Sequence, residues 1–295
     1  MNRCPIIITV AMLLLFSNNA MATSLDGDTG LLFGANHAFK FTATTGWVLD
    51  NKSGVQQGLH MVFYPIDFAW NNSPVIAYGR SVTKTKTLRT IADQVKDTVD
   101  AFHREGSPKY RSQAGELLKL HNGRTAQIYY FSGDQWGNYE AVGYIEEEKT
   151  INFLVFNARK KADYDKYIFD FKSILSTYKN MYSKDINDAM FSQLVVEAKK
   201  LSATEEGQDY ERKLMQKLAP SLSNIMRDCT SYTSREENVG FELVLRIKTS
   251  GQVMEIYARP SNSLTSCVKG MVAPIIHPPH GFKTFVEYIE MKIED

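Results

Sequence analysis

Hydrophobic and polar positions follow their clearest pattern between residues 138 and 179. Segments 139–145 and 150–158 are apolar and rich in β-branched and aromatic residues, which is typical of strands. The charged turn between them, 146–149, is too polar to bury, so we expect it in solvent. From Tyr164 to Tyr178 the apolar residues recur at helical spacing. The pattern therefore predicts a hairpin followed by an amphipathic helix lying across it.

The residues before this stretch predict short strands and one further helix. A stripe of apolar residues from Leu88 to Phe102 has helical spacing, with Thr87 as its expected cap. Asn122-Gly123 is a hairpin turn signal. Residues 23–38 are predicted as a solvated lead-in. The strands are expected at 39–42, 61–64, 75–82, 116–120 and 126–131. This order predicts a mostly antiparallel sheet covered by helices.

A second set of elements follows a polar junction at 180–184. Helical stripes occupy 186–201 and resume at Tyr210, and Pro220 is expected to mark a joint between two helices. Residues 241–247 alternate as a half-buried strand does, and a turn leads into a second strand at 253–258. A short helix, a proline-rich loop and a last strand at 284–293 complete the chain.

The first 22 residues have the pattern of a secretory signal peptide. Arg3 precedes an apolar run, 5–16, of about a dozen residues, which is the size of a signal core. A membrane span needs about 20 residues. Small residues at Ala20 and Ala22 fit cleavage after Ala22. An uncleaved anchor is the alternative. We therefore expect an exported protein, periplasmic or secreted, with no membrane span once the signal is removed.

Cysteine usage agrees with export. Cys4 lies ahead of the apolar run and would be lost on cleavage, which leaves Cys229 and Cys267. An even cysteine count in an exported protein favours a disulfide between these two residues. Two buried free thiols are the alternative.

Charge and composition narrow the function classes. The chain of 295 residues has 43% hydrophobic residues and a net charge of +1. The length favours two domains, and the composition is that of a globular protein. A balanced charge provides no general field for nucleic acid, so we expect no nucleic-acid partner.

Candidate catalytic chemistry is sparse in the sequence. Among six histidines, only His277 and His280 are clustered, in the segment His-Pro-Pro-His. Two imidazoles fall short of the three or four ligands that zinc requires, so no metal and no cofactor are expected. The sequence contains no Gly-x-Ser-x-Gly, phosphate-binding glycine loop or His-Glu-x-x-His motif. We therefore predict no catalytic residues.

Aromatic residues gather around 129–139 and offer a candidate ligand platform. Tyr130, Trp136 and Tyr139 are the candidate ligand-binding residues, because tyrosine and tryptophan combine an apolar face with a hydrogen-bonding tip. Trp136 is expected on a turn, where core packing does not explain an indole. Ordinary packing of a β-core beside an aromatic loop is the alternative.

Two resemblances follow from these patterns. Gly46-Trp47, the strand–helix alternation, the charged hairpin before residues 151–158 and the closing helix at 169–178 resemble the PsbP-like family, over about residues 38–178. That resemblance implies an α/β/α sandwich that serves in binding or assembly. From about residue 210 to 293, the helix–strand–strand–helix–strand order is similar to the C-terminal domain of the TonB/TolA type. It implies pairing with another envelope protein through an exposed strand edge.

The sequence thus predicts an α+β protein with two domains. An antiparallel-sheet α/β/α sandwich, 23–180, is expected to be joined by a helical linker, 181–209, to a small α-β-β-α-β domain, 210–295. The favoured function is binding or scaffolding in the cell envelope without catalysis. The alternatives are an envelope hydrolase or metal-dependent enzyme with a site between domains, and a periplasmic chaperone or inhibitor of exported clients.

Overall fold

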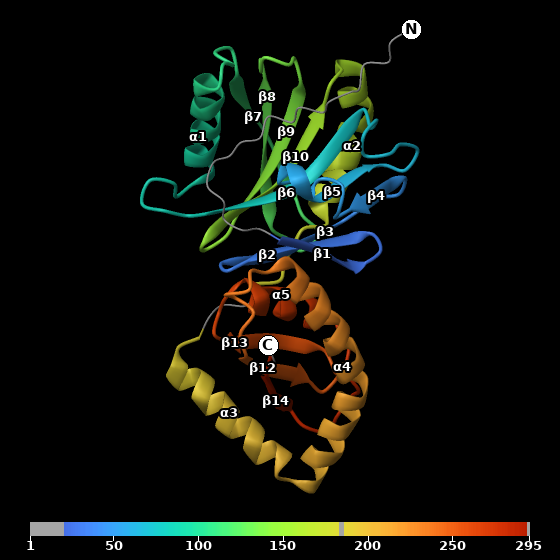
Figure 1. The fold of residues 1–295 in the computed structure, drawn as a ribbon, viewed down its shortest axis with the longest axis vertical. Coiled ribbons are helices and arrows are strands. Elements are labelled where there is room, and N and C mark those ends of the chain that lie inside the picture. Colours follow the sequence, from blue (N-terminus) through green and yellow to red (C-terminus); the bar gives the residue numbers. More distant parts are fainter. Residues whose placement is uncertain (1–20, 183–185, 294–295) are drawn as a thin grey trace. The chain divides into compact units, whose positions relative to one another are not determined.

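The computed structural model describes residues 21–182 and 186–293, so most of the predicted signal segment lies outside the described residues. The described chain divides into two compact units. The first comprises residues 21–32 and Lys40–Lys179, and the second comprises Phe33–Phe39 and the described residues from Asn180 onward. Figure 1 shows the helices and strands of both.

The first unit is built on a seven-stranded sheet with the order β4-β5-β6-β10-β9-β8-β7, in which neighbouring strands run antiparallel. The last four strands form a meander, as the sequence pattern predicts. The short 3-10 helix Val55–Gln57 precedes β5. The strands are β4 (Trp47–Asp50), β5 (His60–Pro65), β6 (Val75–Thr83), β7 (Arg111–Lys119), β8 (Thr125–Ser132), β9 (Tyr139–Glu146) and β10 (Thr150–Ala158).

Two helices, α1 (Ile91–Arg104) and α2 (Lys161–Ser176), cover opposite faces of this sheet (Figure 1). Successive side chains of a strand point to opposite faces. Tyr144 of β9 packs in the hydrophobic cluster that contains Val95 and Phe102 of α1. The preceding residue, Gly143, lies against Leu175 of α2, so closely that a Cβ atom would come within 2.1 Å of the leucine side chain. The arrangement is therefore helix, sheet, helix.

Two local predictions for this unit were wrong. Thr90, not Thr87, caps α1, because the side chains of Thr90 and Asp93 bond each other's backbone amides in a capping box. The charged turn at 146–149 is not wholly in solvent. The side chain of Glu147 is only 12% exposed and pairs with Arg124. A carboxylate turns inward when a cation and hydrogen-bond donors satisfy it there.

A second sheet has the order β1-β2-β3-β11. Its strands are β1 (Met21–Asp26), β2 (Thr29–Gly34), β3 (His37–Thr42) and β11 (Lys179–Asn180). The solvated lead-in predicted at 23–38 was therefore wrong, since Leu31, Leu32 and Phe33 are fully buried. These residues are an uninterrupted apolar run, which is typical of a strand that is buried on both sides.

The second unit contains a three-stranded antiparallel sheet with the order β13-β12-β14. Val244 and Val286 pack against Phe191 and Ala198 of α3 on one face. On the other face, the ring of Phe285 contacts Tyr210 of α4. The elements are α3 (Asp188–Ser202), α4 (Glu205–Tyr232), β12 (Phe241–Lys248), β13 (Val253–Arg259), α5 (Ser263–Val272) and β14 (Thr284–Met291).

The long helix α4 passes through Pro220 without ending, so the predicted joint there was wrong. Proline inside a helix costs about 3 kcal/mol. Burial of an apolar stripe along the whole helix offsets that cost. The stripe consists of Leu214, Leu218, Leu222, Ile225 and Cys229.

The expected disulfide joins Cys229 of α4 to Cys267 of α5. Both units combine helices with antiparallel sheets, so the predicted α+β class is confirmed. Among the described residues, no helix is both long and apolar enough to cross a membrane.

Candidate binding groove

A groove of about 440 Å³ opens in the second unit between the start of α4 and the proline-rich loop before β14. The helix contributes residues spaced three and four apart, which places them on one face. The loop contributes four consecutive residues. The lining residues are Glu206, Asp209, Tyr210, Lys213, Pro279, His280, Gly281 and Phe282. We call this site the α4 groove.

Aromatic rings pack together beneath the α4 groove. The ring centroid of Tyr210 lies 4.6 Å from that of His280 and 4.6 Å from that of Phe285. Phe282 lies 5.2 Å from Phe285 and 5.8 Å from His280. Edge-to-face and tilted contacts of this kind each contribute about 1 kcal/mol beyond the area that they bury. The groove therefore has a rigid aromatic floor.

Backbone hydrogen bonds hold the loop in place. The amide of His277 donates to the carbonyl of Gly251 at 2.9 Å, and the amide of His280 donates to the carbonyl of Thr249 at 3.0 Å. Gly251 has a φ of +82°, and a Cβ atom there would lie 1.9 Å from the carbonyl oxygen of His277. Only glycine permits this approach. The Tyr210 hydroxyl donates to the carbonyl of Pro278 at 3.0 Å, which joins helix to loop.

Two acidic residues and one lysine line the groove. Glu206, Asp209 and Lys213 are its charged lining residues, and Lys213 pairs with Asp209 at 2.6 Å. Burial lowers the pKa of His280, which is therefore neutral near pH 7. Burial, with a smaller effect of Glu287, raises the pKa of Tyr210 to about 12, so the phenol is neutral as well. Asp209 also pairs with Arg212 at 3.3 Å, so Glu206 is the lining acid without an ion pair among the described residues.

Two buried titratable residues lie in the same unit, His277 and Glu287, each 2% exposed. Burial lowers the pKa of His277 to about 4 and raises that of Glu287 to about 8. Both groups are therefore neutral near pH 7. Within the described residues, no group of three or more histidine, cysteine, aspartate or glutamate side chains is placed to hold a metal ion. The structure places His277 in the core and His280 in the groove, where it belongs to the aromatic floor.

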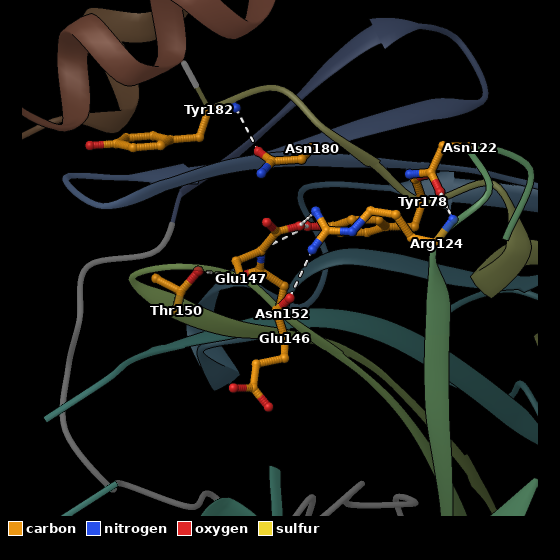
Figure 2. Close-up of polar contacts among 9 residues, drawn as sticks. All are labelled: Asn122, Arg124, Glu146, Glu147, Thr150, Asn152, Tyr178, Asn180 and Tyr182. Carbon is orange, nitrogen blue, oxygen red and sulfur yellow. Dashed lines mark hydrogen bonds and ion pairs between the residues drawn. The ribbon is translucent and has the colours of Figure 1, made fainter. Parts of the chain in front are cut away.

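A polar network in the first unit has a different character (Figure 2). The Tyr178 hydroxyl donates to Glu147 Oε1 at 2.8 Å and accepts from Asn152 Nδ2 at 2.9 Å. Arg124 binds the same carboxylate and also donates to the carbonyl of Glu146 at 2.9 Å. Asn122 Nδ2 donates to the carbonyl of Tyr178 at 3.0 Å. The network ties two hairpin turns to the segment after α2, and its polar atoms satisfy one another, so we interpret it as structural.

The structure describes the surroundings of all three aromatic candidates of the first unit. Tyr130 and Tyr139 lie on the face of the sheet that α2 covers. The Tyr130 hydroxyl donates to Glu116 Oε2 at 2.7 Å, and the ring of Tyr139 lies 6.1 Å from that of Tyr164 in α2. Trp136 lies on the turn between Asp134 and Gly137 and is 41% exposed. A shared platform of these three residues remains a prediction.

Sequence reasoning did not find the α4 groove, although it singled out His280. The acidic residues of α4 precede the loop by about seventy positions, and no sequence motif links them. One signal was present, because Tyr210 continues the apolar stripe of α4 while carrying a polar tip that must find a partner when buried.

Comparisons with known proteins add little to this description. No protein-family model matches the chain, and no curated protein matches its sequence. Cyanobacterial PsbP (CyanoP) from Synechocystis is similar in structure, with a TM-score of 0.34 and 10% identity over 52% of this chain and 94% of that chain. A protein from Bacteroides thetaiotaomicron has a TM-score of 0.28 and 9% identity over 68% of each chain. At TM-scores this low, neither likeness informs on function.

Proposed function

We propose that this chain is an exported binding protein without catalytic activity, and that the α4 groove is its binding site. The observation that carries the proposal is the groove itself, which places tyrosine, phenylalanine and histidine rings beside charged side chains in an open concave site. Concave, aromatic-lined sites with a few polar groups are the common form of ligand and peptide sites. Tyrosine is also enriched among the few interface residues that contribute most of the binding energy.

Two further features support export to an oxidising compartment such as the periplasm. The disulfide between Cys229 and Cys267 would persist there and not in a reducing cytosol. The apolar segment 5–16 with small residues before position 23 is typical of a signal peptide.

The domain assignment is part of the same proposal. We propose a PsbP-like sandwich at 23–180 and a TonB-C-terminal-like domain at 210–295. The segment 181–209, predicted as a helical linker, contains α3, which packs on the sheet of the second unit, so we assign it to that unit. The helix–sheet–helix order of the first unit and the element order α4-β12-β13-α5-β14 support these assignments. The proposed partner is another envelope protein.

Site-specific photocrosslinking in the intact cell envelope tests the proposed function. A photoreactive residue replaces Phe282, which lines the groove, and in a matched control it replaces Phe169, which is 72% exposed on α2 of the first unit. We expect one protein to be captured from position 282 and not from position 169. The captured protein, once purified, should bind the wild-type chain and bind the Phe282→Ala variant less tightly. Absence of capture from a folded, abundant protein, or equal capture from both positions, would refute the proposal.

A further inference from the structure

We propose that the α4 groove receives a cationic side chain, lysine or arginine, presented by an extended segment of a partner polypeptide. This inference rests on the proposed function and adds the chemical class of the partner. It depends on three features of the groove, namely a free carboxylate, a cradle that positions this carboxylate, and neutral aromatic rings beside it.

Glu206 supplies the free carboxylate. Asp209 is engaged by Lys213 at 2.6 Å and by Arg212 at 3.3 Å. Across the described part of the chain, no such ion pair forms with Glu206. Burial lowers the pKa of His280 although Glu206 acts to raise it, so His280 is neutral near pH 7. Glu206 thus presents a carboxylate without an ion pair, which a cation complements.

Gly281 forms the cradle for this carboxylate. A Cβ atom at position 281 would lie 2.7 Å from Glu206 Oε1, so any larger residue would displace the carboxylate from its place against the loop. Only the end of a flexible side chain would have to move, because no backbone atom lies within 4 Å of that position outside the neighbouring residues. The loop backbone and the carboxylate are therefore in contact because residue 281 has no side chain.

The aromatic floor fits the same ligand. A lysine or arginine side chain has an apolar stem that packs on aromatic rings and a charged tip that is attracted to the faces of such rings. Tyr210 is held neutral, and its hydroxyl is already used by the carbonyl of Pro278. Its ring therefore acts through its shape and its π electrons.

The open form of the groove favours a polypeptide over a free organic cation. Sites for small molecules enclose most of the ligand surface, whereas a side chain tethered to a longer segment needs only its tip to be enclosed. A segment lying across Pro279 and Phe282 would add apolar contact outside the carboxylate. The proposal is therefore a basic segment in extended conformation.

Fluorescence anisotropy with labelled peptides tests this inference on the full-length protein. The probes are a short glycine-rich peptide containing arginines and the same peptide with glutamate in place of arginine. We expect the basic peptide to bind, with an affinity that falls as salt is added, and the acidic peptide not to bind. Glu206→Gln should weaken binding about tenfold, because the acceptor oxygen remains but loses the negative charge that pairs with the cation. Gly281→Ala should weaken it to a smaller extent, because it shifts the end of the Glu206 side chain without changing the net charge.

Glu205→Gln is the matched control, since Glu205 lies in the same first turn of α4 but does not line the groove. Both substitutions remove one acid from a helix N-terminus, so they change helix stability equally. Equal binding of the two peptides, or equal weakening by Glu205→Gln and Glu206→Gln, would overturn the inference. Competition by free arginine as strong as that of the peptide would also overturn it, in favour of a small cation. If the partner captured from position 282 still binds through the groove while no basic peptide does, the proposed function stands and the cationic class is wrong.

Discussion

The hydroxyl group of Tyr110 donates a 2.8 Å hydrogen bond to Glu140 Oε1 beside a stack of aromatic rings in the first unit. The ring of Tyr110 lies 3.9 Å from that of Phe102 and 5.5 Å from that of Phe131. Burial in these surroundings raises the pKa of Glu140 from its ordinary value of 4.5 to about 7, although the Tyr110 bond acts in the opposite direction. In the folded protein, Glu140 therefore keeps its proton at pH values where an ordinary glutamate has already lost it.

This proton makes the stability of the first unit depend on pH. Between pH 4.5 and about 7, the folded state keeps the Glu140 proton and the unfolded state releases it, so stability falls as pH rises through this window. Glu140→Gln cannot ionise and retains an oxygen for the Tyr110 hydroxyl. We expect this variant to be more stable than the wild type by about 3 kcal/mol near pH 8, and by less than about 1 kcal/mol near pH 5. Denaturant unfolding at the two pH values measures this difference, and a gain that does not change with pH would contradict the prediction.

The network around Tyr178 predicts a large cost for removing one hydroxyl group. In Tyr178→Phe, Asn152 and Glu147 each lose a partner in a buried site. Leaving such groups unsatisfied costs about 1–3 kcal/mol. Tyr130→Phe is the matched control, because its hydroxyl bonds to Glu116, whose side chain is 44% exposed and keeps its ion pair with Lys172. Thermal unfolding should show a clearly greater loss for Tyr178→Phe than for Tyr130→Phe. Equal losses would mean that the Tyr178 network stabilises the fold no more than the exposed hydrogen bond of Tyr130 does.

Much of the fold follows from local patterns in the sequence. The hairpin of β9 and β10 and the helix α2 lie where alternation and helical spacing place them. The strands β1 and β2 were missed because the glycines and aspartates around Leu31–Phe33 suggested a loop, whereas burial of this run depends on distant partners. The joint predicted at Pro220 was wrong for the same reason, because packing outside the local sequence decided the structure. A local preference that costs about 3 kcal/mol is overridden when a long apolar stripe packs.

The residues of the candidate groove were harder to predict from the sequence than the fold was. His277 and His280 looked equivalent in a His-Pro-Pro-His segment, yet one is buried and the other lines the groove. Backbone hydrogen bonds to Gly251 and Thr249 position the two histidines. The environment of each ring therefore depends on how the loop packs on the β12–β13 turn. The pairing of Cys229 with Cys267 was accessible from counting alone, because only two cysteines follow the predicted signal segment.

The disulfide should contribute strongly to the stability of the second unit. It joins residues 38 positions apart, and closing a loop of this length stabilises a fold by roughly 3–4 kcal/mol. We expect reductant to lower the unfolding temperature of the wild-type protein. The double variant Cys229→Ser, Cys267→Ser should unfold at a lower temperature whether or not reductant is added. Calorimetry in both conditions measures this. A wild-type transition that is insensitive to effective reduction, verified by thiol titration, would contradict the prediction.

Glu287 should make the second unit lose stability as the solution becomes alkaline. It lies on β14, directly opposite Leu245 of β12. Its Oε2 atom has no hydrogen-bond partner among the described residues. Burial, reinforced by the nearby charge of Glu211, raises its pKa from 4.5 to about 8. The folded state therefore keeps a proton that the unfolded state releases above pH 4.5, and stability falls as pH rises until it levels off above about 8.

Replacement of this carboxyl group by an amide isolates its effect. Glu287→Gln keeps the shape of the side chain and cannot ionise, so near pH 9 it should exceed the wild type in stability by about 2–4 kcal/mol. Glu290→Gln is the control on the same strand, since that side chain is 56% exposed and its charge remains solvated in both states. Hydrogen exchange of the amides of β12 and β14, followed from about pH 6 to pH 9, reports on this unit alone. The protection that the wild type loses in this range should persist in Glu287→Gln and be lost in Glu290→Gln. If Glu287→Gln lost protection in parallel with the wild type, the alkaline sensitivity would belong to another group and its assignment to Glu287 would be wrong.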